Sequence, residues 1–329
     1  MRKLIRYALA AAISLGGPAT TAYAQEAKET YGMVVFLKGS EFFNWCFAGF
    51  KDAAESVGAV AELQGPADWD ASAESRAVDQ LVAKKVKGIA VTAGDADTLV
   101  SSINAAMKAG VATLTFDSDS PKSKRLLFVG TDHYNAGFAA GVKMGELLGN
   151  KAKIGFSGIP GLDAINARRE GFIAGLKSVA PEAEIVAEVN DEGDLQKAET
   201  VITAMLQANP QINGIFTLHG NPATGAVAAA RNVGRDSGPD KVQIIAYAID
   251  LPILQMVDSD ELSGTVAQNP YLMGVMAFHM LYAAAHPTQF DNMNNPGFGN
   301  VPTANLDTGV RILTKGDPAI KAFMSPPSL

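Results

Sequence analysis

The sequence predicts an α/β protein with two lobes, each a parallel β-sheet flanked by helices on both faces. Short apolar, β-branched runs alternate with longer helix-like stretches along almost the whole chain. This alternation gives more strands than one ordinary open sheet holds. The roughly 300 residues after an N-terminal leader also exceed a comfortable single core. We therefore expect two lobes of similar design.

The first half of the chain follows this rhythm closely. Its apolar runs predict strands at 33–37, 60–63, 88–92 and 111–116, and the stretches between them predict helices at 41–57, 71–85 and 96–108. Another apolar run, 126–129, follows the fourth strand with no helix between them. Thr131 or Asp132 then offers an N-cap for a helix rich in glycine and alanine that continues to Leu148.

The second half repeats the pattern and contains two irregularities. Strands are predicted at 153–157, 183–189, 214–217 and 242–247, and helices at 163–179, 195–207 and 222–232. A strand then meets a helix led by Pro270, and the segment 289–305 is rich in Asn, Pro and Gly. We expect the chain to cross between lobes at these breaks. The predicted first lobe is 28–131, completed by about 269–298, and the second is 132–268, completed by about 299–325.

Residues 1–24 have the features of a secretory signal peptide. Arg2, Lys3 and Arg6 precede the apolar run 7–15, and the triplet 22–24 is an A-x-A cleavage site. The apolar run is too short for a permanent membrane helix, and no cysteine lies near the cleavage site. We expect an exported, soluble, periplasmic protein without a lipid anchor.

The charge balance and the cysteine count exclude several functions. Without the leader the chain has 24 Lys and Arg against 34 Asp and Glu, which argues against nucleic-acid binding and attachment to an acidic membrane. The single cysteine, Cys46, can form no internal disulfide and is expected to be a small buried side chain. The sequence contains no P-loop, GxSxG or HExxH motif and no GxGxxG after the first strand, and its four histidines are dispersed. We expect no catalytic residues, no cofactor and no metal site.

Polar and aromatic residues recur just after the predicted strands. Because ligands bind outside the carboxyl ends of parallel strands, two facing lobes would gather these side chains around one cleft. Carboxylates would accept hydrogen bonds from hydroxyls, amides and Lys would donate, and aromatic rings would cover apolar C–H faces. The predicted ligand-binding residues are Lys38, Ser40, Phe42, Phe43, Thr92, Asp117, Asp163, Asn166, His219, Asn221, Tyr247 and Gln268.

Structural roles remain open for some of these residues and their neighbours. Asp117 and Asp163 could cap turns or helices, and Phe42 and Phe43 could belong to the core. Trp69 could form a wall of the cleft or a hydrophobic staple before the next helix. Asp119 and the basic residues 122–125 have the pattern of a solvated turn.

Five ordered segments together resemble the type I periplasmic sugar-binding proteins of ABC transporters, in their ribose-binding-protein-like group. They are 38–43 (KGSEFF), 114–119 (LTFDSD), 130–137 (GTDHYNAG), 166–172 (NARREGF) and 265–268 (TVAQ), and the match extends from about residue 31 to about residue 313. The resemblance implies two Rossmann-like lobes joined by three crossings that close on one small ligand. It further implies that Phe42 and Phe43 stack on the ligand, Asp117 grips its hydroxyls and Gln268 lies at a hinge crossing.

The chain departs from the ribose-type pattern at several positions. Ser40, Thr92 and His219 stand where Asn is usual, Asn166 where Arg is usual, and Ala248 where Asp is usual. Other features are similar to the autoinducer- and rhamnose-binding branch, namely Lys38, the triplet 117–119, Asp163 and the missing acid at Ala248. However, Ala164 stands where that branch has Gln. The implied ligand is therefore a monosaccharide, a polyol or a related small polyhydroxy compound.

The resemblance implies a monomeric solute-binding component that delivers its ligand to a membrane permease. A lactose-repressor-type regulator would need a DNA-binding headpiece, and this chain has a signal peptide in its place. One alternative is an exported sugar hydrolase that uses Asp117 and Asp163 as paired carboxylates. Another is a sensory protein for an autoinducer-type signal, whose closed form engages a chemoreceptor or sensor.

Overall fold

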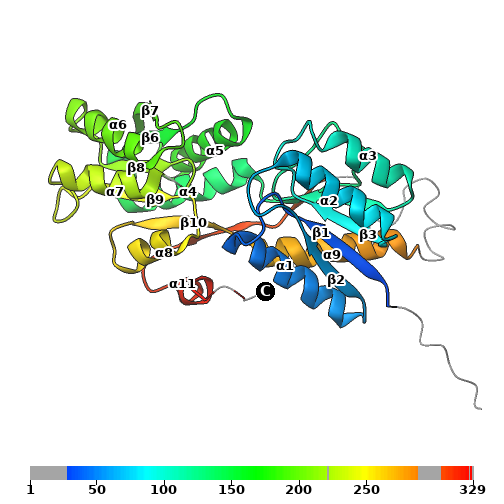
Figure 1. The fold of residues 1–329 in the computed structure, drawn as a ribbon. Coiled ribbons are helices and arrows are strands. Elements are labelled where there is room, and N and C mark those ends of the chain that lie inside the picture. Colours follow the sequence, from blue (N-terminus) through cyan, green and yellow to red (C-terminus); the bar gives the residue numbers. More distant parts are fainter. Residues whose placement is uncertain (1–27, 221, 288–304, 326, 328–329) are drawn as a thin grey trace, which may run out of the picture.

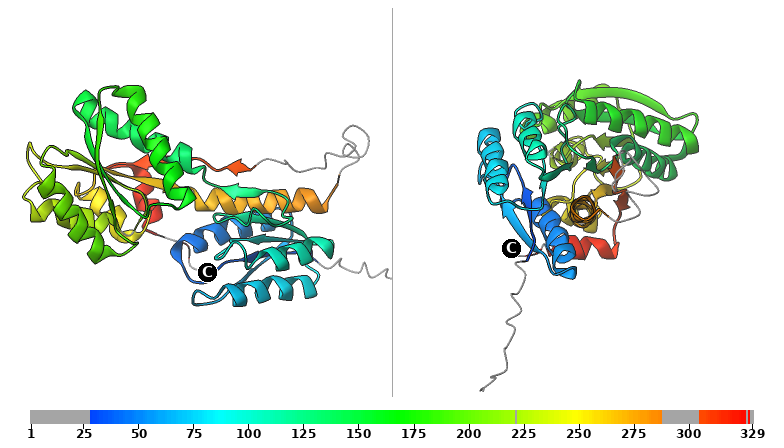
Figure 2. Two further views of the ribbon diagram at one scale, coloured as in Figure 1. Left: turned by 90° about the horizontal axis from the view of Figure 1, so that it is seen from above. Right: turned by 90° about the vertical axis from the view of Figure 1, so that its right-hand side faces the viewer.

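The computed structural model describes residues 28–220, 222–287, 305–325 and 327, which form two α/β lobes arranged side by side (Figures 1 and 2). The expected leader, Asn221 and the expected return to the second lobe near 299 lie outside these residues. Each lobe is built on a six-stranded sheet. This is the predicted fold class.

The sheet of the first lobe is parallel throughout. Its order is β11 (Leu306–Asp307), β5 (Phe128–Gly130), β4 (Ala112–Phe116), β3 (Gly88–Val91), β1 (Thr30–Val34) and β2 (Val60–Gln64). Helices α1 (Glu41–Ser56) and α9 (Pro270–Ala285) cover one face, and α2 (Ala71–Ala83) and α3 (Val100–Lys108) the other. The two-residue period of a strand explains this sandwich: Met33 points to the α1 side and Val34 to the α2 side, and both are fully buried.

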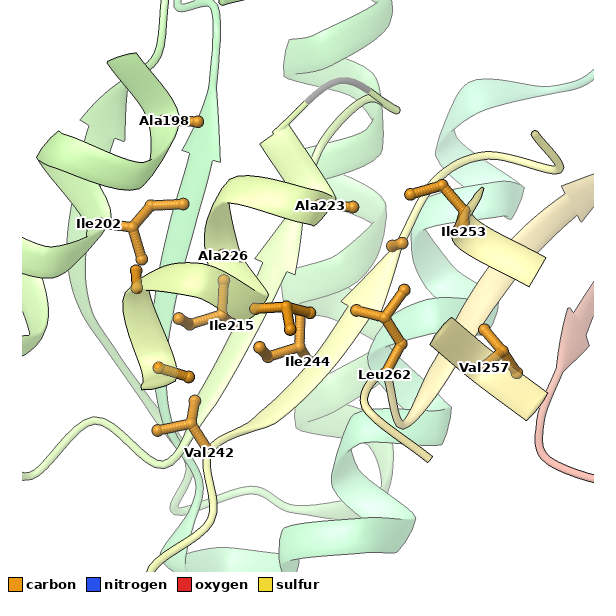
Figure 3. Packing of buried hydrophobic residues seen from close by; sticks show 14 of the residues in the cluster. Ala198, Ile202, Ile215, Ala223, Ala226, Val242, Ile244, Ile253, Val257 and Leu262 are labelled. Carbon is orange, nitrogen blue, oxygen red and sulfur yellow. The ribbon is translucent and has the colours of Figure 1, made fainter. Parts of the chain in front are cut away.

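The sheet of the second lobe has one antiparallel edge strand. Its order is β12 (Val310–Leu313), β10 (Gly264–Gln268), β9 (Gln243–Ala246), β8 (Gly214–Thr217), β6 (Lys153–Gly158) and β7 (Glu184–Asn190), and β12 runs against β10. One face is covered by α4 (His133–Leu148) and α5 (Asp163–Val179). The other is covered by α6 (Leu195–Ala208), α7 (Pro222–Asn232), α8 (Leu251–Asp258) and α11 (Pro318–Phe323). Figure 3 shows Ile215 and Ile244 beneath α7 in this core.

The helices α4 and α5 approach each other unusually closely because glycines lie between them. A Cβ atom on Gly141 would lie 2.0 Å from the carbonyl oxygen of Phe172, and one on Gly137 would lie 2.0 Å from that of Arg168. The glycine–alanine pattern that predicted α4 is therefore the surface on which α5 packs.

Within the described residues the chain crosses between the lobes three times, after β5, after β10 and after β11. Gln268 Nε2 donates to Thr131 Oγ1 at 3.0 Å, which joins the first two crossings. Thr308, in the third crossing, donates its amide and its hydroxyl to the carbonyl oxygen of Gly130 at 2.8 and 3.1 Å. The structure has Leu306 and Asp307 in the first sheet, so this crossing comes later than the expected position near 299. A two-residue edge strand is too short to be recognised from its pattern.

Several elements differ from the expectation. Helix α3 begins at Val100 rather than at 96, because Asp95 caps a preceding turn by accepting from the amide of Thr98 at 2.7 Å. The short helices α8 and α11 were not predicted. Cys46 is buried, as expected.

The second lobe also touches the first outside the crossings. The ring of Phe323 in α11 lies 5.9 Å from the ring of Trp45 in α1, in an edge-to-face arrangement. None of the helices in the described part of the chain is long and apolar enough to cross a membrane.

Candidate functional site

Asp117 lies directly after β4 and has an unusual backbone conformation. Its φ of 58° is in the left-handed region, which costs a residue with a side chain about 1–3 kcal/mol. Hydrogen bonds on both sides hold it there: its amide donates to Val129 at 3.0 Å, and the carbonyl of Ser118 accepts from Ala93 at 3.0 Å. Such strain is typical of functional positions.

The carboxylate of Asp117 has only weak partners among the described residues. Thr92 Oγ1 and Ser118 Oγ donate to its Oδ2 at 3.4 and 3.3 Å, both long for hydrogen bonds to an oxygen. Burial raises the pKa of Asp117 to about 6, although the Ser118 hydrogen bond, the charge of Arg168 and the Thr92 hydrogen bond oppose this. The group is therefore ionised at neutral pH and can accept stronger hydrogen bonds from a ligand.

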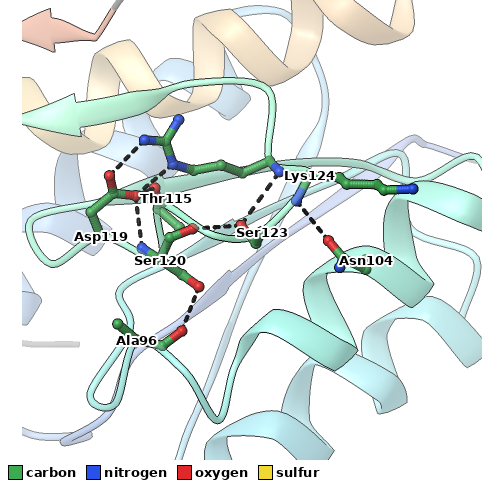
Figure 4. Close-up of polar contacts among 8 residues, drawn as sticks. Ala96, Asn104, Thr115, Asp119, Ser120, Ser123 and Lys124 are labelled. Carbon is green, nitrogen blue, oxygen red and sulfur yellow. Dashed lines mark hydrogen bonds and ion pairs between the residues drawn. The ribbon is translucent and has the colours of Figure 1, made fainter.

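Asp119 is not the solvated turn acid that the sequence suggested. It accepts from Nε and from Nη2 of Arg125 at 2.5 Å each, and from Thr115 Oγ1 at 2.6 Å and the amide of Ser120 at 2.7 Å (Figure 4). Its side chain is 23% exposed, and that of Arg125 is 14% exposed. This network closes the turn that carries Asp117. No local pattern indicated this network, because the partner of Asp119 lies six residues away across the turn.

The second lobe contributes Arg168 and Tyr247, which lie in contact. The guanidinium carbon of Arg168 lies 3.7 Å from the centre of the Tyr247 ring. Nη1 of Arg168 donates to the carbonyl of Leu218 at 2.8 Å. Burial lowers the pKa of Arg168, opposed by Tyr247 and Asp117, and burial raises the pKa of Tyr247, opposed mainly by Arg168. Asp117 and Arg168 thus influence each other's charge from opposite lobes.

The surroundings of Arg168 leave hydrogen-bonding capacity unused. Its Nη2 lies 3.3 Å from Nδ1 of His133, whose pKa is lowered to about 4 by burial and by Arg168. That imidazole is therefore neutral and accepts. Among the described residues, the hydroxyl of Thr217 is buried without a partner, and Nε of Arg168 and the hydroxyl of Tyr247 have none beyond the contact between these two side chains. Buried polar atoms ordinarily have partners, so these atoms indicate a polar ligand.

Arg168 was not among the predicted site residues, and Asn166 was. The structure places Asn166 exposed on α5, two positions before Arg168. Residues two apart on a helix lie on nearly opposite faces, and it is the side chain of Arg168 that contacts Tyr247. The sequence contained one signal for Arg168: Asn166 stands where Arg is usual, and an Arg follows two residues later.

Tyr247 also lines a cavity of about 220 Å³ together with Phe42 of the first lobe. Gly220, Ala248, Asp250 and Gln268 contribute to the same cavity. Asp250, which was not predicted, places a carboxylate close to the position where Ala248 lacks one. Its side chain makes no capping hydrogen bond at the start of α8.

Asp163 lines a different cavity, of about 410 Å³, with Asp132, His133 and Asp307 beside the crossings. Two of these acids have structural tasks. Asp307 accepts from the amide of Asp132 at 3.0 Å and from Nδ2 of Asn135 at 3.2 Å, and Oδ1 of Asp132 caps α4 by accepting from the amide of Asn135 at 2.9 Å. Asp163 itself is exposed at the start of α5.

His219 follows β8 and is held by a buried carboxylate that sequence reasoning missed. Its Nε2 lies 2.9 Å from Oδ1 of Asp191, which is fully buried directly after β7. Oδ2 of Asp191 accepts from Ser157 Oγ at 2.6 Å.

The remaining predicted residues are dispersed. Phe43 is 4% exposed in the core, where it contacts Phe36, Phe42 and Phe116 edge-to-face, whereas Phe42 reaches the cavity. The side chain of Lys38 is exposed, and Ser40 is half-buried before α1. Asn221 lies outside the described residues. Trp69 is 66% exposed, and its ring lies 4.9 Å from that of Phe36.

Two lobes joined by three crossings, with buried polar atoms short of partners on α5 and at the ends of β8 and β9, are typical of a bilobal protein that binds a small ligand. Comparison of the chain with known protein families agrees with this class. Residues 31–287 match the periplasmic binding protein domain, and the chain belongs to that family.

Curated relatives and solved structures extend the comparison. The chain is 27% identical over 250 residues to a ribose import binding protein of Bacillus subtilis, covering 75% of this chain and 79% of the relative. It is 28% identical to the D-allose-binding periplasmic protein of Escherichia coli, covering 78% and 85%. An arabinose-binding protein from Geobacillus stearothermophilus superimposes with a TM-score of 0.84 at 27% identity, covering 91% of this chain and 100% of that one. A sugar-binding protein of a sugar ABC transporter from Bacillus halodurans gives 0.81 at 30% identity, covering 90% and 100%.

Replacement of Asp119 tests the network around the turn. We expect Asp119→Ala to lower the free energy of unfolding by about 1–3 kcal/mol, because Arg125 is left largely buried without its partner. Urea unfolding measures this change. Lys122→Ala, on the same turn as Asp119, is the matched control. It breaks only the exposed ion pair between Lys122 and Asp97, so it should change the free energy of unfolding by less than about 0.5 kcal/mol. Equal effects of the two variants would contradict the proposed role of Asp119.

The raised pKa of Asp117 predicts a pH dependence of stability. The folded state binds this proton more tightly than the unfolded state, so the stabilisation is complete below about pH 4 and is lost as the pH rises through about 6. We expect the Asp117→Asn variant to lack this pH-dependent loss, which amounts to about 3 kcal/mol in the free energy of unfolding when urea unfolding is compared across this range.

Glu74, whose pKa burial raises to about 8, acts in the same direction but is present in both proteins and cancels. Replacement of the exposed Asp68 by Asn is the control and should leave the pH profile of the wild type unchanged. An Asp117→Asn profile identical to that of the wild type would show that Asp117 has an ordinary pKa.

Proposed function

We propose that this protein is the solute-binding component of an ABC importer, exported to the periplasm by residues 1–24. It binds a monosaccharide, polyol or related polyhydroxy compound between its lobes and delivers it to the membrane permease. The observation that carries the proposal is the placement of Asp117 and Arg168, which come from opposite lobes and act on each other's charge while lacking full hydrogen bonding. The named ligands of the relatives, ribose, allose and arabinose, support an aldose as the ligand.

The chemistry of the facing groups suits hydroxyl recognition. An ionised carboxylate at Asp117 accepts from neighbouring hydroxyls, and the guanidinium of Arg168 donates to ring or hydroxyl oxygens. Phe42 and Tyr247 provide aromatic surface for the apolar face of a sugar ring. Gln268 reaches the cavity from a crossing, so ligand contact there would be transmitted to the hinge. Roles for Lys38, Ser40, Thr92, Asp163, Asn166 and Asn221 remain predictions.

Binding without turnover is part of the proposal. The relatives are named as binding proteins. In addition, Asp117 and Asp163 do not form a pair, because Asp117 lies beside Thr92 and Asp163 lines a separate cavity beside the crossings. After overnight incubation, mass spectrometry should recover the bound sugar unchanged. Conversion that disappears in Asp117→Asn would replace the proposal with the hydrolase alternative.

Closure of the lobes is the structural test. Thermal-shift screening of residues 25–329 against D-ribose, D-allose, D-arabinose, polyols and an autoinducer-type furanosyl compound should identify the ligand. A hundredfold excess over the dissociation constant stabilises the folded state by about 2.7 kcal/mol. X-ray scattering should then show a smaller radius of gyration with that compound. An unchanged radius at saturation would contradict a closing cleft.

Replacement of Asp117 tests the site directly. We expect Asp117→Ala to weaken binding of the compound found in the screen by roughly ten- to a hundredfold, because it removes charge-assisted hydrogen bonds worth about 1.5–3 kcal/mol. Isothermal titration calorimetry measures the loss, and circular dichroism confirms that the variant is folded. Asp68→Asn, far from any described contact of Asp117, is the control. Equal affinities of wild type and Asp117→Ala would remove this residue from the site.

A further inference from the structure

Three neighbouring strand ends in the second lobe meet at one buried carboxylate. Asp191 follows β7, Ser157 belongs to β6 and His219 follows β8, and these strands are adjacent in the sheet. Asp191 is 0% exposed and accepts from Ser157 Oγ at 2.6 Å, from the amide of Gly193 at 2.9 Å and from Nε2 of His219 at 2.9 Å. Its oxygens are thus directed at fixed donors rather than at solvent.

The charge of Asp191 determines which ring nitrogen of His219 carries the proton in their contact. Burial opposes ionisation, but the hydrogen bonds from His219, Ser157 and Gly193 outweigh it and hold the pKa of Asp191 below its usual range. An ionised carboxylate only accepts hydrogen bonds, so Nε2 of His219 must carry the proton of that contact. In the neutral ring, Nδ1 is then left unprotonated and is an acceptor.

The ring of His219 is partly accessible and precedes a residue of the cavity lining. The side chain of His219 is 17% exposed, although its Asp191 partner is completely buried. The next residue, Gly220, lines the cavity that Phe42 and Tyr247 share.

We propose that Asp191 is a positioning residue that fixes His219 as a hydrogen-bond acceptor for a hydroxyl of the ligand. The inference rests on the proposed function, since it assigns part of the selectivity of the same cleft. An imidazole held in this way accepts a hydrogen bond from a hydroxyl, whereas an asparagine amide at that position could rotate to present either a donor or an acceptor. The second lobe would thereby prefer a sugar with a hydroxyl at the facing carbon over its deoxy analogue.

The tautomer of His219 is the first test and needs no ligand. Nitrogen-15 NMR of histidine-labelled protein at about pH 8, where imidazoles are ordinarily neutral, reports which nitrogen is protonated. We expect His219 with the proton on Nε2 in the wild type and a mixture of tautomers in Asp191→Ala. Ser157→Ala is the matched control, because it removes another donor to the same carboxylate and should leave the tautomer unchanged. A wild-type proton on Nδ1, or an unchanged spectrum in Asp191→Ala, would overturn the proposal.

Binding is the second test, with D-ribose, D-allose and D-arabinose as the probes in calorimetry. For the sugar bound most tightly, we expect His219→Ala and Asp191→Ala each to weaken binding roughly tenfold, and the double variant to weaken it no further. Asp191→Asn can present either its amide oxygen or its NH2 group to Nε2 of His219, so it should also give a mixture of tautomers and lose part of the affinity. It also carries the test if Asp191→Ala does not fold.

The outcomes separate the two proposals. Unchanged affinity in His219→Ala, or losses that add in the double variant, would refute the role of Asp191 while leaving sugar binding intact. If none of the three sugars binds, the choice of an aldose in the proposed function fails, and the nitrogen spectra still decide whether Asp191 fixes the imidazole.

Discussion

The rest of the molecule depends on the hydrogen bonds that join the two sheets at their crossings. Each lobe has its own cores, and the lobes are tied together by a few hydrogen bonds that converge on Gly130, Thr131 and Asp132. Gln268 and Thr308 reach these residues from the other two crossings. Because these ties lie together at the crossings, they are the contacts about which the closure suggested under the proposed function would turn.

The two walls of the cleft position their polar groups in different ways. In the first lobe a strained residue, Asp117, is held by the turn that Asp119 and Arg125 close. In the second lobe the groups are stacked and buried, with Arg168 against Tyr247 and Asp191 beneath His219. Both arrangements fix the geometry before a ligand arrives, which reduces the entropy lost on binding. Rigid walls joined by a flexible hinge suit a protein that must recognise its ligand and then release it.

Local sequence signals predicted the framework well. The bounds of α5, α7 and β8 agree with the prediction to the residue, because each has a clear apolar period and a distinct boundary. The short helices α8 and α11 were not predicted, because six or eight residues with a proline in the first turn carry too little periodicity. The two-residue strand β11 at the sheet edge was missed for the same reason. Asp117, Tyr247 and Gln268 could be proposed from the sequence because they directly follow or end a strand.

The supporting residues of the site could not be found in this way. Asp191 meets Ser157 and His219 only because β7, β6 and β8 are neighbours in the sheet, and strand order is not written in any one segment. The choice between Asn166 and Arg168 depends on the rotation of α5 against α4, which glycine contacts set. Asp119 was misassigned because an acid beside lysines and an arginine has the same composition whether the turn is open or closed by an ion pair.

The contact between Trp45 and Phe323 connects the hinge to affinity. These rings belong to different lobes and meet outside the crossings, so rotation of the lobes changes their separation. Whatever free energy the contact contributes in one arrangement is missing from the other, and it enters the equilibrium between them. The measured dissociation constant equals the intrinsic one divided by the fraction of molecules ready to bind. Under the proposed function, substitutions of Trp45 or Phe323 would therefore change the affinity for the ligand through this equilibrium rather than through the groups that line the cavity.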